Sequence, residues 1–380
     1  MKGQTRNIYP GGNTPVGFYS YYNYILEQRK AEKIFCLKGG PGTGKSTLLK
    51  SIGNYFLEKG EDVDFFWCSS DPDSLDGVLL KKRAIALMDA TSPHIVDPKN
   101  PGAVDEIVNL GELWNEENIR KNRKKIIECN EKIAETFKLT YGYLGIAGKQ
   151  YEFMAELMDK IITEEKFYDI KKMLNMKLNS LLVLRRAESK MSRESAMGVE
   201  PMPGKSVKFF AGAVTPGGVK SGLSSIAESI DKLILINVPV GFRTEKLLEP
   251  AAERLTDAGL DIEKYYCPMS PEKKLEHIVV PEGGFAVICC NSYHRINSID
   301  LNKKVMIIDA DFEKEKNPQI TAIWEDMLNE SEKNIDKALQ LLKKAKEYHD
   351  QLESYYIPNM DFERMEDIKL RIIDDILSKS

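Results

Sequence analysis

The sequence contains one pattern twice, and this internal repeat limits the fold more than any other feature. Three stretches of the first half recur in the same order about 200 residues later. They are GGNTPVGFYS (11–20) with GAVTPGGVKS (212–221), KGEDVDFFWC (59–68) with AGLDIEKYYC (258–267), and LDGVLLKKRAIALMDATSPHIVD (75–97) with LEHIVVPEGGFAVICCNSYHRIN (275–297). Three matches in order at one spacing indicate a duplicated domain rather than two unrelated segments.

The boundary between the copies is predicted in SRESAMGVEPMPGKS (192–206), a polar stretch that contains proline and glycine. We therefore expect one domain over residues 1–198 and a second over residues 199–380. A chain of 380 residues is also too long for one ordinary hydrophobic core, which agrees with two domains.

Each copy continues into amphipathic helices. Charged and apolar residues recur at helical spacing over 117–162 in the first copy and over 331–356 in the second. A further amphipathic run follows each of them, at 165–185 and at 362–378. We expect these helical tails to pack on their own domains, and coiled-coil contacts are the alternative.

Composition excludes several classes of protein. The net charge of −4 gives no basic field for a nucleic-acid partner. The six cysteines have no CxxC spacing, which favours buried thiols in a reducing compartment over a disulfide framework or a zinc site. No apolar run approaches the ~18 residues of a membrane span, and the first residues lack a signal-peptide pattern. We expect a cytoplasmic protein without a membrane partner.

The stretch KIFCLKGGPGTGKSTLL (33–49) has the order of strand, glycine-rich loop and helix start that a phosphate-binding loop, or P-loop, requires. Inward-pointing backbone N–H groups bind phosphate in such a loop, and glycines leave room for it and tolerate positive φ. The residues that we expect to bind the nucleotide are Gly39, Gly40, Pro41, Gly42, Thr43, Gly44, Lys45, Ser46 and Thr47.

Three residues are expected to carry the chemistry of this site. Lys45 would contact the β- and γ-phosphates, and the hydroxyl of Ser46 would bind Mg²⁺. A helix that begins near Lys45 adds partial positive charge. Asp89 follows four apolar residues in RAIALMDATSPH, which is the Walker B pattern, and is the second expected Mg²⁺ ligand.

The general base is not assigned by any motif. Asp71, Asp73 and Asp76 in CSSDPDSLDG follow the second expected strand and should lie at the same carboxyl edge of the sheet. Asp71 is the first candidate, and Glu106 and Glu112 are further ones. Each of these residues has a helix cap or a turn as its alternative role.

Two segments are candidates for covering the nucleotide. NIRKNRKKII places Arg120 and Arg123 at helical spacing, with Lys121, Lys124 and Lys125 beside them. They would form a lid or an arginine finger, but a solvated helix face is the more usual role of such a run. GGNTPVGFYSYYNY (11–24) offers aromatic rings for the base, although its recurrence in the second copy favours a structural turn.

The second copy keeps the pattern of the loop and loses its chemistry. In LILINVPVGFRTEKLL (233–248), aligned on the prolines, the positions of Gly39, Gly40, Gly42, Gly44 and Lys45 are held by Asn237, Val238, Val240, Phe242 and Arg243. Cys289 stands at the position of Asp89. We expect Val238, Val240 and Phe242 to fill the space that phosphate would need. Asp309 and Asp311 imitate a Walker B motif, but their spacing assigns them to a later strand.

The motifs GGNTPxGF, KGGPGTGKST, CSSDPDSLDG and DATSPHIVDPKNPGAVDEIVNLGE resemble a family of uncharacterised bacterial tandem P-loop ATPase-like proteins. The resemblance extends over essentially the whole chain. It implies two three-layer α/β domains of the P-loop NTPase type with parallel sheets, and ATP binding. Members of the family can carry a proper P-loop in both halves, so this chain departs from them in its second half.

The leading interpretation is an ATP-binding protein, an Mg²⁺-dependent ATPase with one active site in the first half and a pseudo-site in the second. A small-molecule or nucleotide kinase is one alternative. A nucleotide-dependent sensor or scaffold that does not hydrolyse ATP is another. The sequence leaves open a small-molecule partner, a protein partner and a homo-oligomer.

Overall fold

The computed structural model describes residues 2–91, 96–192, 202–296, 303–310 and 317–379. The chain forms two compact units, each assembled from separate segments. Unit 1 contains Met1–Gly145, Gly212–Gly222 and Ile335–Ser380, and unit 2 contains Ile146–Ala211 and Leu223–Asn334. The domain boundary predicted at 198/199 lies outside the described residues, and it stays a prediction.

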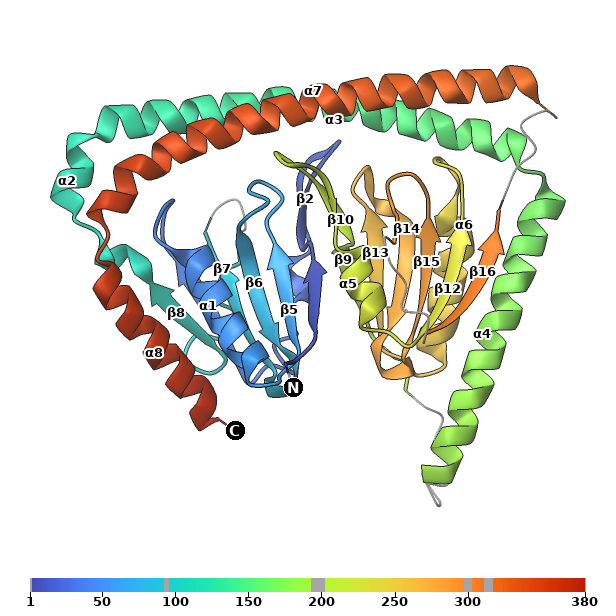
Figure 1. Ribbon diagram of the computed structural model, residues 1–380, viewed down its shortest axis with the longest axis horizontal. Helices are drawn as coiled ribbons and strands as arrows, with labels where there is room; N and C mark the ends of the chain where they lie inside the picture. Colours follow the sequence, from blue (N-terminus) through green and yellow to red (C-terminus); the bar gives the residue numbers. More distant parts are fainter. Residues whose placement is uncertain (1, 92–95, 193–201, 297–302, 311–316, 380) are drawn as a thin grey trace. The chain divides into compact units, whose positions relative to one another are not determined.

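Unit 1 contains a six-stranded sheet in the order β1-β5-β6-β7-β4-β8 (Figure 1). The strands are β1 (Thr5–Ile8), β5 (Val63–Trp67), β6 (Leu75–Leu80), β7 (Ile85–Asp89), β4 (Lys33–Lys38) and β8 (Asp105–Asn109). β6 runs antiparallel to both of its neighbours, and all other pairs are parallel. The sheet is therefore mixed, with parallel strands in the majority.

The register of the parallel strands positions the site. β4 and β7 pair with Leu37 beside Asp89, so the end of β7 lies next to the start of the glycine-rich loop. Helix α1 (Lys45–Glu58) follows that loop and buries one apolar stripe, which includes Leu49, Ile52 and Phe56. This stripe packs with sheet residues such as Phe35 in the main core of unit 1.

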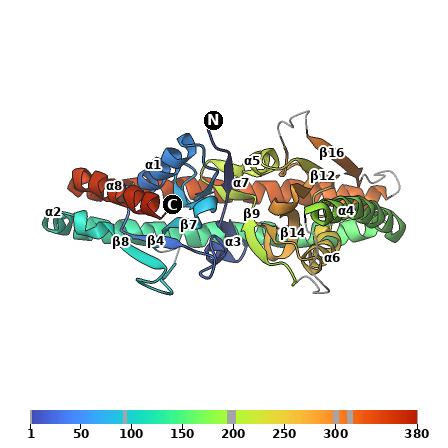
Figure 2. The ribbon, with the colours of Figure 1, turned by 90° about the horizontal axis from the view of Figure 1, so that it is seen from below.

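The far end of the chain completes the same core. Helix α8 (Phe362–Ser378) begins at Asp361, whose side chain accepts a hydrogen bond from the backbone N–H of Arg364. It lies against α1 (Figure 2), and its residues Ile372 and Ile376 belong to the core cluster that contains the strands of unit 1. Burial of these side chains explains why the helix forms where its amphipathic pattern predicts it.

Unit 2 repeats this architecture. Its sheet has the order β16-β12-β15-β14-β13-β9, in which each strand corresponds to one strand of unit 1. The strands are β16 (Lys304–Asp309), β12 (Lys232–Asn237), β15 (Phe285–Cys290), β14 (Ser270–Val280), β13 (Ile262–Cys267) and β9 (Ser206–Phe210). Helix α6 (Thr244–Asp257) stands in the place of α1, and a short helix, α5 (Leu223–Glu228), precedes β12. The predicted duplication of α/β domains, each with a helical tail, is confirmed.

Two hairpins repeat as well, and both belong to unit 1. They are β2 (Gly11–Thr14) with β3 (Gly17–Ser20), and β10 (Gly212–Thr215) with β11 (Gly218–Ser221). Asn13 is fully buried and donates hydrogen bonds to the carbonyl oxygens of Ser69 (3.1 Å) and Val214 (2.9 Å). Asn13 therefore has a structural role in this segment, which supports that interpretation of the GGNTP motif.

The helical tails differ from expectation in where they pack. After α2 (Glu116–Lys121), α3 (Arg123–Ile161) begins in unit 1 and ends in unit 2, whereas α7 (Pro318–Tyr356) begins in unit 2 and ends in unit 1. α4 (Glu164–Ser192) follows α3 in unit 2. The expectation that each tail packs on its own domain is therefore wrong for the ends of α3 and α7, for α4 and for α8. Periodicity identifies the buried face of a helix and does not identify its partner.

Within each unit the two long helices pack against each other. In unit 1, Ile126 and Cys129 of α3 form a small core with Leu352 of α7. In unit 2, Met154 and Met158 of α3 pack in one cluster with Trp324 of α7. Among the described residues, no helix is long and apolar enough to cross a membrane.

Candidate nucleotide site

The glycine-rich loop joins β4 to α1 in a conformation that needs glycine. Gly42 and Gly44 have φ values of +67° and +79°, which residues with a Cβ rarely adopt. Gly44 is also the residue that precedes the first turn of α1, so the N–H groups of that turn open onto the loop. The 14 residues of α1 then add the partial positive charge of a helix N-terminus.

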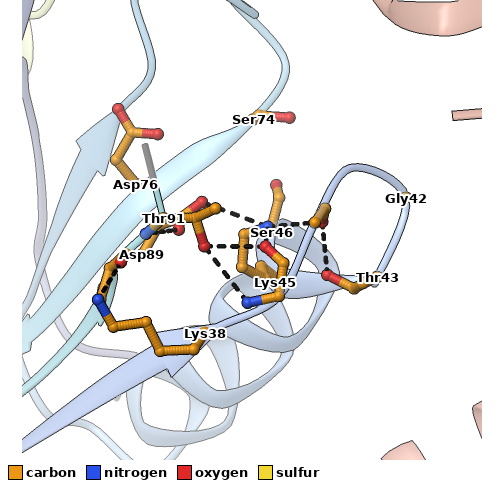
Figure 3. Close-up of polar contacts among 12 residues, drawn as sticks. Lys38, Gly42, Thr43, Lys45, Ser46, Ser74, Asp76, Asp89 and Thr91 are labelled. Atoms are coloured by element: carbon orange, nitrogen blue, oxygen red, sulfur yellow. Dashed lines mark hydrogen bonds and ion pairs between the residues drawn. The ribbon is translucent and has the colours of Figure 1, made fainter. Parts of the chain in front are cut away.

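Lys45 lies between the loop and Asp89 at the end of β7 (Figure 3). Its ammonium group donates hydrogen bonds to the carbonyl oxygens of Gly39 (2.7 Å) and Gly40 (2.8 Å), and lies 3.7 Å from Oδ2 of Asp89. The side chains of Lys45 and Asp89 are each only 12% exposed, so this charge pair is poorly screened by water. The structure thus brings together the lysine and the carboxylate that the sequence assigned to one site.

Thr91 links the Asp89 strand to the loop. Its backbone N–H donates to Oδ1 of Asp89 (2.9 Å), and its hydroxyl donates to the carbonyl oxygen of Gly39 (2.8 Å). The N–H of Gly39 in turn donates to the Thr91 hydroxyl at 3.3 Å. Sequence reasoning missed this residue, although its position two residues after Asp89 was a usable signal.

The hydroxyl groups of the loop are also engaged. Ser46 Oγ accepts a hydrogen bond from the backbone N–H of Leu75 (3.0 Å), and Thr43 Oγ1 donates to the carbonyl oxygen of Gly40 (2.9 Å). Thr47 is exposed at the same end of α1. Ser46 and Asp89 offer a hydroxyl and a carboxylate, which are the hard oxygen ligands that Mg²⁺ prefers, and both line the cavity described below.

The acidic candidates occupy different positions. Asp71, Asp73 and Asp76 line the same cavity as the loop, and Asp71 also contacts Lys346 at 3.4 Å. Asp76 is buried and accepts a hydrogen bond from the hydroxyl of Tyr22. Burial and the charge of Asp76 raise the pKa of Tyr22 well above its ordinary value, so that hydroxyl remains protonated. Asp71 is therefore partly exposed, whereas Asp76 borders the cavity from a buried position and is hydrogen-bonded to Tyr22.

The remaining candidates lie away from the loop. Arg120 is 79% exposed and pairs with Glu116 one turn earlier in α2, as a solvated helix face would. Glu106 pairs with Lys33 and Arg371, and Glu112 accepts a hydrogen bond from Asn109. Arg123 is likewise exposed, and none of these residues lines the cavity at the loop.

A cavity of about 770 Å³ opens over the loop in unit 1. Its polar floor is the glycine-rich loop with Asp89, Thr91 and the Asp71 segment. Its apolar part includes Phe18 of β3 and the stacked rings of Phe137 and Tyr141 of α3, whose centroids lie 5.9 Å apart. Volumes of this size suit a nucleotide or another small molecule.

Helix α7 supplies a wall of this cavity that sequence reasoning missed. His349 and Glu353 line it, and Oε1 of Glu353 accepts a hydrogen bond from the N–H of Gly42 at 3.1 Å. Lys346, one turn earlier, lies between Asp71 and Asp350. Partial burial by itself would lower the pKa of Lys346, but its contacts with those two carboxylates raise it. The His349–Glu353 spacing of one helical turn was the only signal in the sequence.

In unit 2 the corresponding loop carries buried apolar side chains, although a cavity of about 560 Å³ borders its residues Asn237, Val238 and Pro239. Val238, Val240 and Phe242 are all buried, and Gly241 has a φ of +90°. Val240 packs in the cluster that contains Trp324, whose indole N–H donates to the carbonyl oxygen of Val240 at 2.9 Å. Apolar side chains thus surround the loop where the loop of unit 1 has glycines.

Arg243, the cationic residue of this second loop, is paired with a carboxylate of unit 2. Arg243 Nε lies 2.8 Å from Oδ2 of Asp159 in α3, and Lys246 Nζ lies 3.1 Å from the other carboxylate oxygen. Asp309 ends β16, which pairs with β12 on the side away from β15, and it accepts a hydrogen bond from Asn237. Asp309 is therefore on the later strand that its spacing predicted. Asp311 lies outside the described residues.

Unit 2 also buries Glu276, His277 and His294 close together, which invites comparison with a metal site. His294 Nε2 lies 2.7 Å from Glu276, and the ammonium group of Lys274 lies 3.8 Å from the same carboxylate. Nδ1 of His277 accepts the N–H of Cys289 at 3.2 Å, so the proton of its neutral ring is on Nε2. No lone pair of His277 remains for a metal, and the group is better described as a buried ion-pair cluster.

Comparison with known proteins adds one match. A family model of the N-terminal part of nephrocystin 3 matches residues 20–129, which include the glycine-rich loop, α1 and Asp89. No curated protein and no solved structure matches the chain significantly.

Proposed function

We propose that unit 1 binds ATP with Mg²⁺ and hydrolyses it. The observation that carries this proposal is the position of Lys45, which lies among the loop carbonyl oxygens and 3.7 Å from Asp89, at the N-terminus of a 14-residue helix. Backbone N–H groups, a helix N-terminus and a lysine are the groups that bind phosphate, and a neighbouring carboxylate is the group that holds its metal.

Each residue has a defined part in this proposal. Lys45 would leave the carbonyl oxygens of Gly39 and Gly40 to contact the phosphates, and Ser46 and Asp89 would hold Mg²⁺. The metal supplies positive charge to the phosphate oxygens. Asp71 is the candidate general base, because it is less buried than Asp76, whose carboxylate accepts a hydrogen bond from Tyr22.

Release of phosphate from ATP by the purified chain tests this function. Lys45→Ala should reduce the rate at least tenfold, because a preorganised positive charge on the phosphates is lost. Lys59→Ala is the matched control, since Lys59 is exposed just beyond the other end of α1. Equal rates for wild type and Lys45→Ala would contradict an ATPase. Tight binding of ATP without turnover would indicate a nucleotide sensor instead.

We propose further that unit 2 is a pseudo-site. Its buried valines and phenylalanine and the pairing of Arg243 with Asp159 support this interpretation. The resemblance to tandem P-loop ATPase-like proteins implies two nucleotide sites per chain. We propose that this chain keeps the site of unit 1 and has lost the site of unit 2.

A kinase acting on a small acceptor is the second candidate. The apolar part of the cavity, with Phe18, Phe137 and Tyr141, favours it because this part extends beyond the phosphate loop. The same assay can be repeated with a library of small acceptors. Faster ATP consumption in the presence of an acceptor would support a kinase, and an unchanged rate would favour water as the acceptor.

A further inference from the structure

The tip of the glycine-rich loop is in direct contact with the end of α7. The N–H of Gly42 donates to Oε1 of Glu353 at 3.1 Å. A Cβ at Gly42 would lie 2.8 Å from Cγ1 of Ile357 and 3.4 Å from the carbonyl oxygen of Glu353. The loop tip therefore has no spare room on the side of α7.

A carboxylate and a phosphate are competing acceptors for such an N–H group. Both are anionic oxygens that form short, charge-assisted hydrogen bonds with backbone amides. If the loop binds ATP as proposed above, Glu353 holds an amide that the loop would otherwise offer to a phosphate oxygen. The negative charge of Glu353 would also repel a polyanion that enters the cavity.

The hold of Glu353 on the loop is weak enough to be reversed. Its side chain is 28% exposed, and its Oε1 lies 3.9 Å from Nδ1 of His349, one turn earlier in α7. One amide hydrogen bond at a partly exposed site contributes little to stability, because water competes for both groups. The binding free energy of a ligand that makes several phosphate contacts can exceed the contribution of this one hydrogen bond.

Unit 2 has a related arrangement, in which a helix carboxylate contacts side chains next to the loop instead of a loop amide. There the carboxylate of Asp159, from the end of α3, contacts both Arg243 and Lys246 at the start of α6. Phe242 is buried beside it and stacks on Phe167, with ring centroids 5.8 Å apart. Each unit thus presents a carboxylate from the end of a long helix to the loop before its first core helix. Only in unit 1 is the loop itself free of bulky side chains.

We propose that Glu353 is a built-in anion that occupies the phosphate loop in the absence of nucleotide. Nucleotide binding displaces it and moves the last turns of α7 away from the loop. This inference rests on the proposed function of unit 1 and adds its regulation, because whatever holds α7 in place also opposes nucleotide binding.

Calorimetric titration of the full chain with a nonhydrolysable ATP analogue, and separately with inorganic tripolyphosphate, tests the proposal. Glu353→Gln should bind both about tenfold more tightly than wild type, since the competing charge is gone. Glu347→Gln is the matched control, because Glu347 lies on the same helix, is 64% exposed and pairs with Lys344. It should bind like wild type.

The outcomes separate this inference from the function on which it rests. Binding by wild type with equal or weaker binding by Glu353→Gln would overturn the displaced anion and leave the nucleotide site intact. Absence of binding by every variant would overturn the nucleotide site itself. In wild type, hydrogen exchange of residues 346–357 should accelerate when the analogue is added, and slower exchange there would contradict the displacement even if the variant misfolds.

Discussion

At the scale of single residues, His277 shows how burial sets a charge. Its ring is 1% exposed and accepts the N–H of Cys289, while Glu276 and His294 face it. Burial, followed by the charge of His294, lowers the pKa of His277 to about 3, although Glu276 acts in the opposite direction. The folded protein therefore keeps this imidazole neutral in a range where an unfolded chain would protonate it.

The free energy of unfolding should consequently fall as the pH is lowered from about 6.5 to about 3. In that range the unfolded state binds one proton more than the folded state at this residue, which costs up to about 1.4 kcal/mol per pH unit. His277→Gln keeps an acceptor for Cys289 and removes the titration. Urea unfolding at several pH values should show a shallower acid dependence for the variant, and parallel profiles would refute this role.

At the scale of elements, α8 is a helix whose two faces have different environments. Ile372 is fully buried in the core of unit 1, whereas Leu370, two residues earlier, is 51% exposed. The helix therefore contributes to stability through one stripe, as its periodicity requires.

Ile372→Ala should lower the free energy of unfolding of unit 1 by about 2–5 kcal/mol, because it removes buried surface and leaves a cavity. Leu370→Ala on the same helix should change it by less than about 0.5 kcal/mol. Equilibrium denaturation with urea measures both. Similar losses for the two variants would show that α8 is not anchored by this stripe.

The elements also show what the sequence could and could not predict. Repeat spacing predicted two domains of one kind, and the glycine-rich stretch predicted a strand, a loop and α1 at the observed positions. The sequence did not predict that β6 runs antiparallel to β5 and β7. A short apolar run indicates a strand but does not indicate how that strand is oriented relative to its neighbours. Nor did the sequence predict the wall formed by His349 and Glu353, because the contact with Gly42 spans 311 positions in the chain.

At the scale of the whole molecule, the two sequence copies and the two compact units do not coincide. Unit 1 takes a hairpin, Gly212–Gly222, and the helical segment Ile335–Ser380 from the second copy. These segments supply Ile372 to its core and Glu353 to its cavity. The first copy by itself therefore lacks part of the core and a wall of the candidate site.

A fragment of residues 1–205 should accordingly fail to unfold cooperatively and should bind tripolyphosphate much more weakly than the full chain. Addition of a separate fragment of residues 206–380 should restore both properties, since it returns the missing segments without a covalent link. Thermal unfolding and calorimetry measure them. Full affinity in the shorter fragment by itself would contradict this account.

The exchange of helix ends between the units bears on how such a chain evolves. In a dimer of two identical ancestral chains that exchanged their C-terminal helices, each chain would have needed the other to complete its core. Fusion of the two genes would have kept that dependence. Once fused, the second half could lose its own glycines and metal carboxylate without becoming dispensable, because its last helices still complete the first half. The glycine-rich loop of the first half and the altered loop of the second half fit such a history, because the C-terminal helices complete unit 1 whatever the second loop binds.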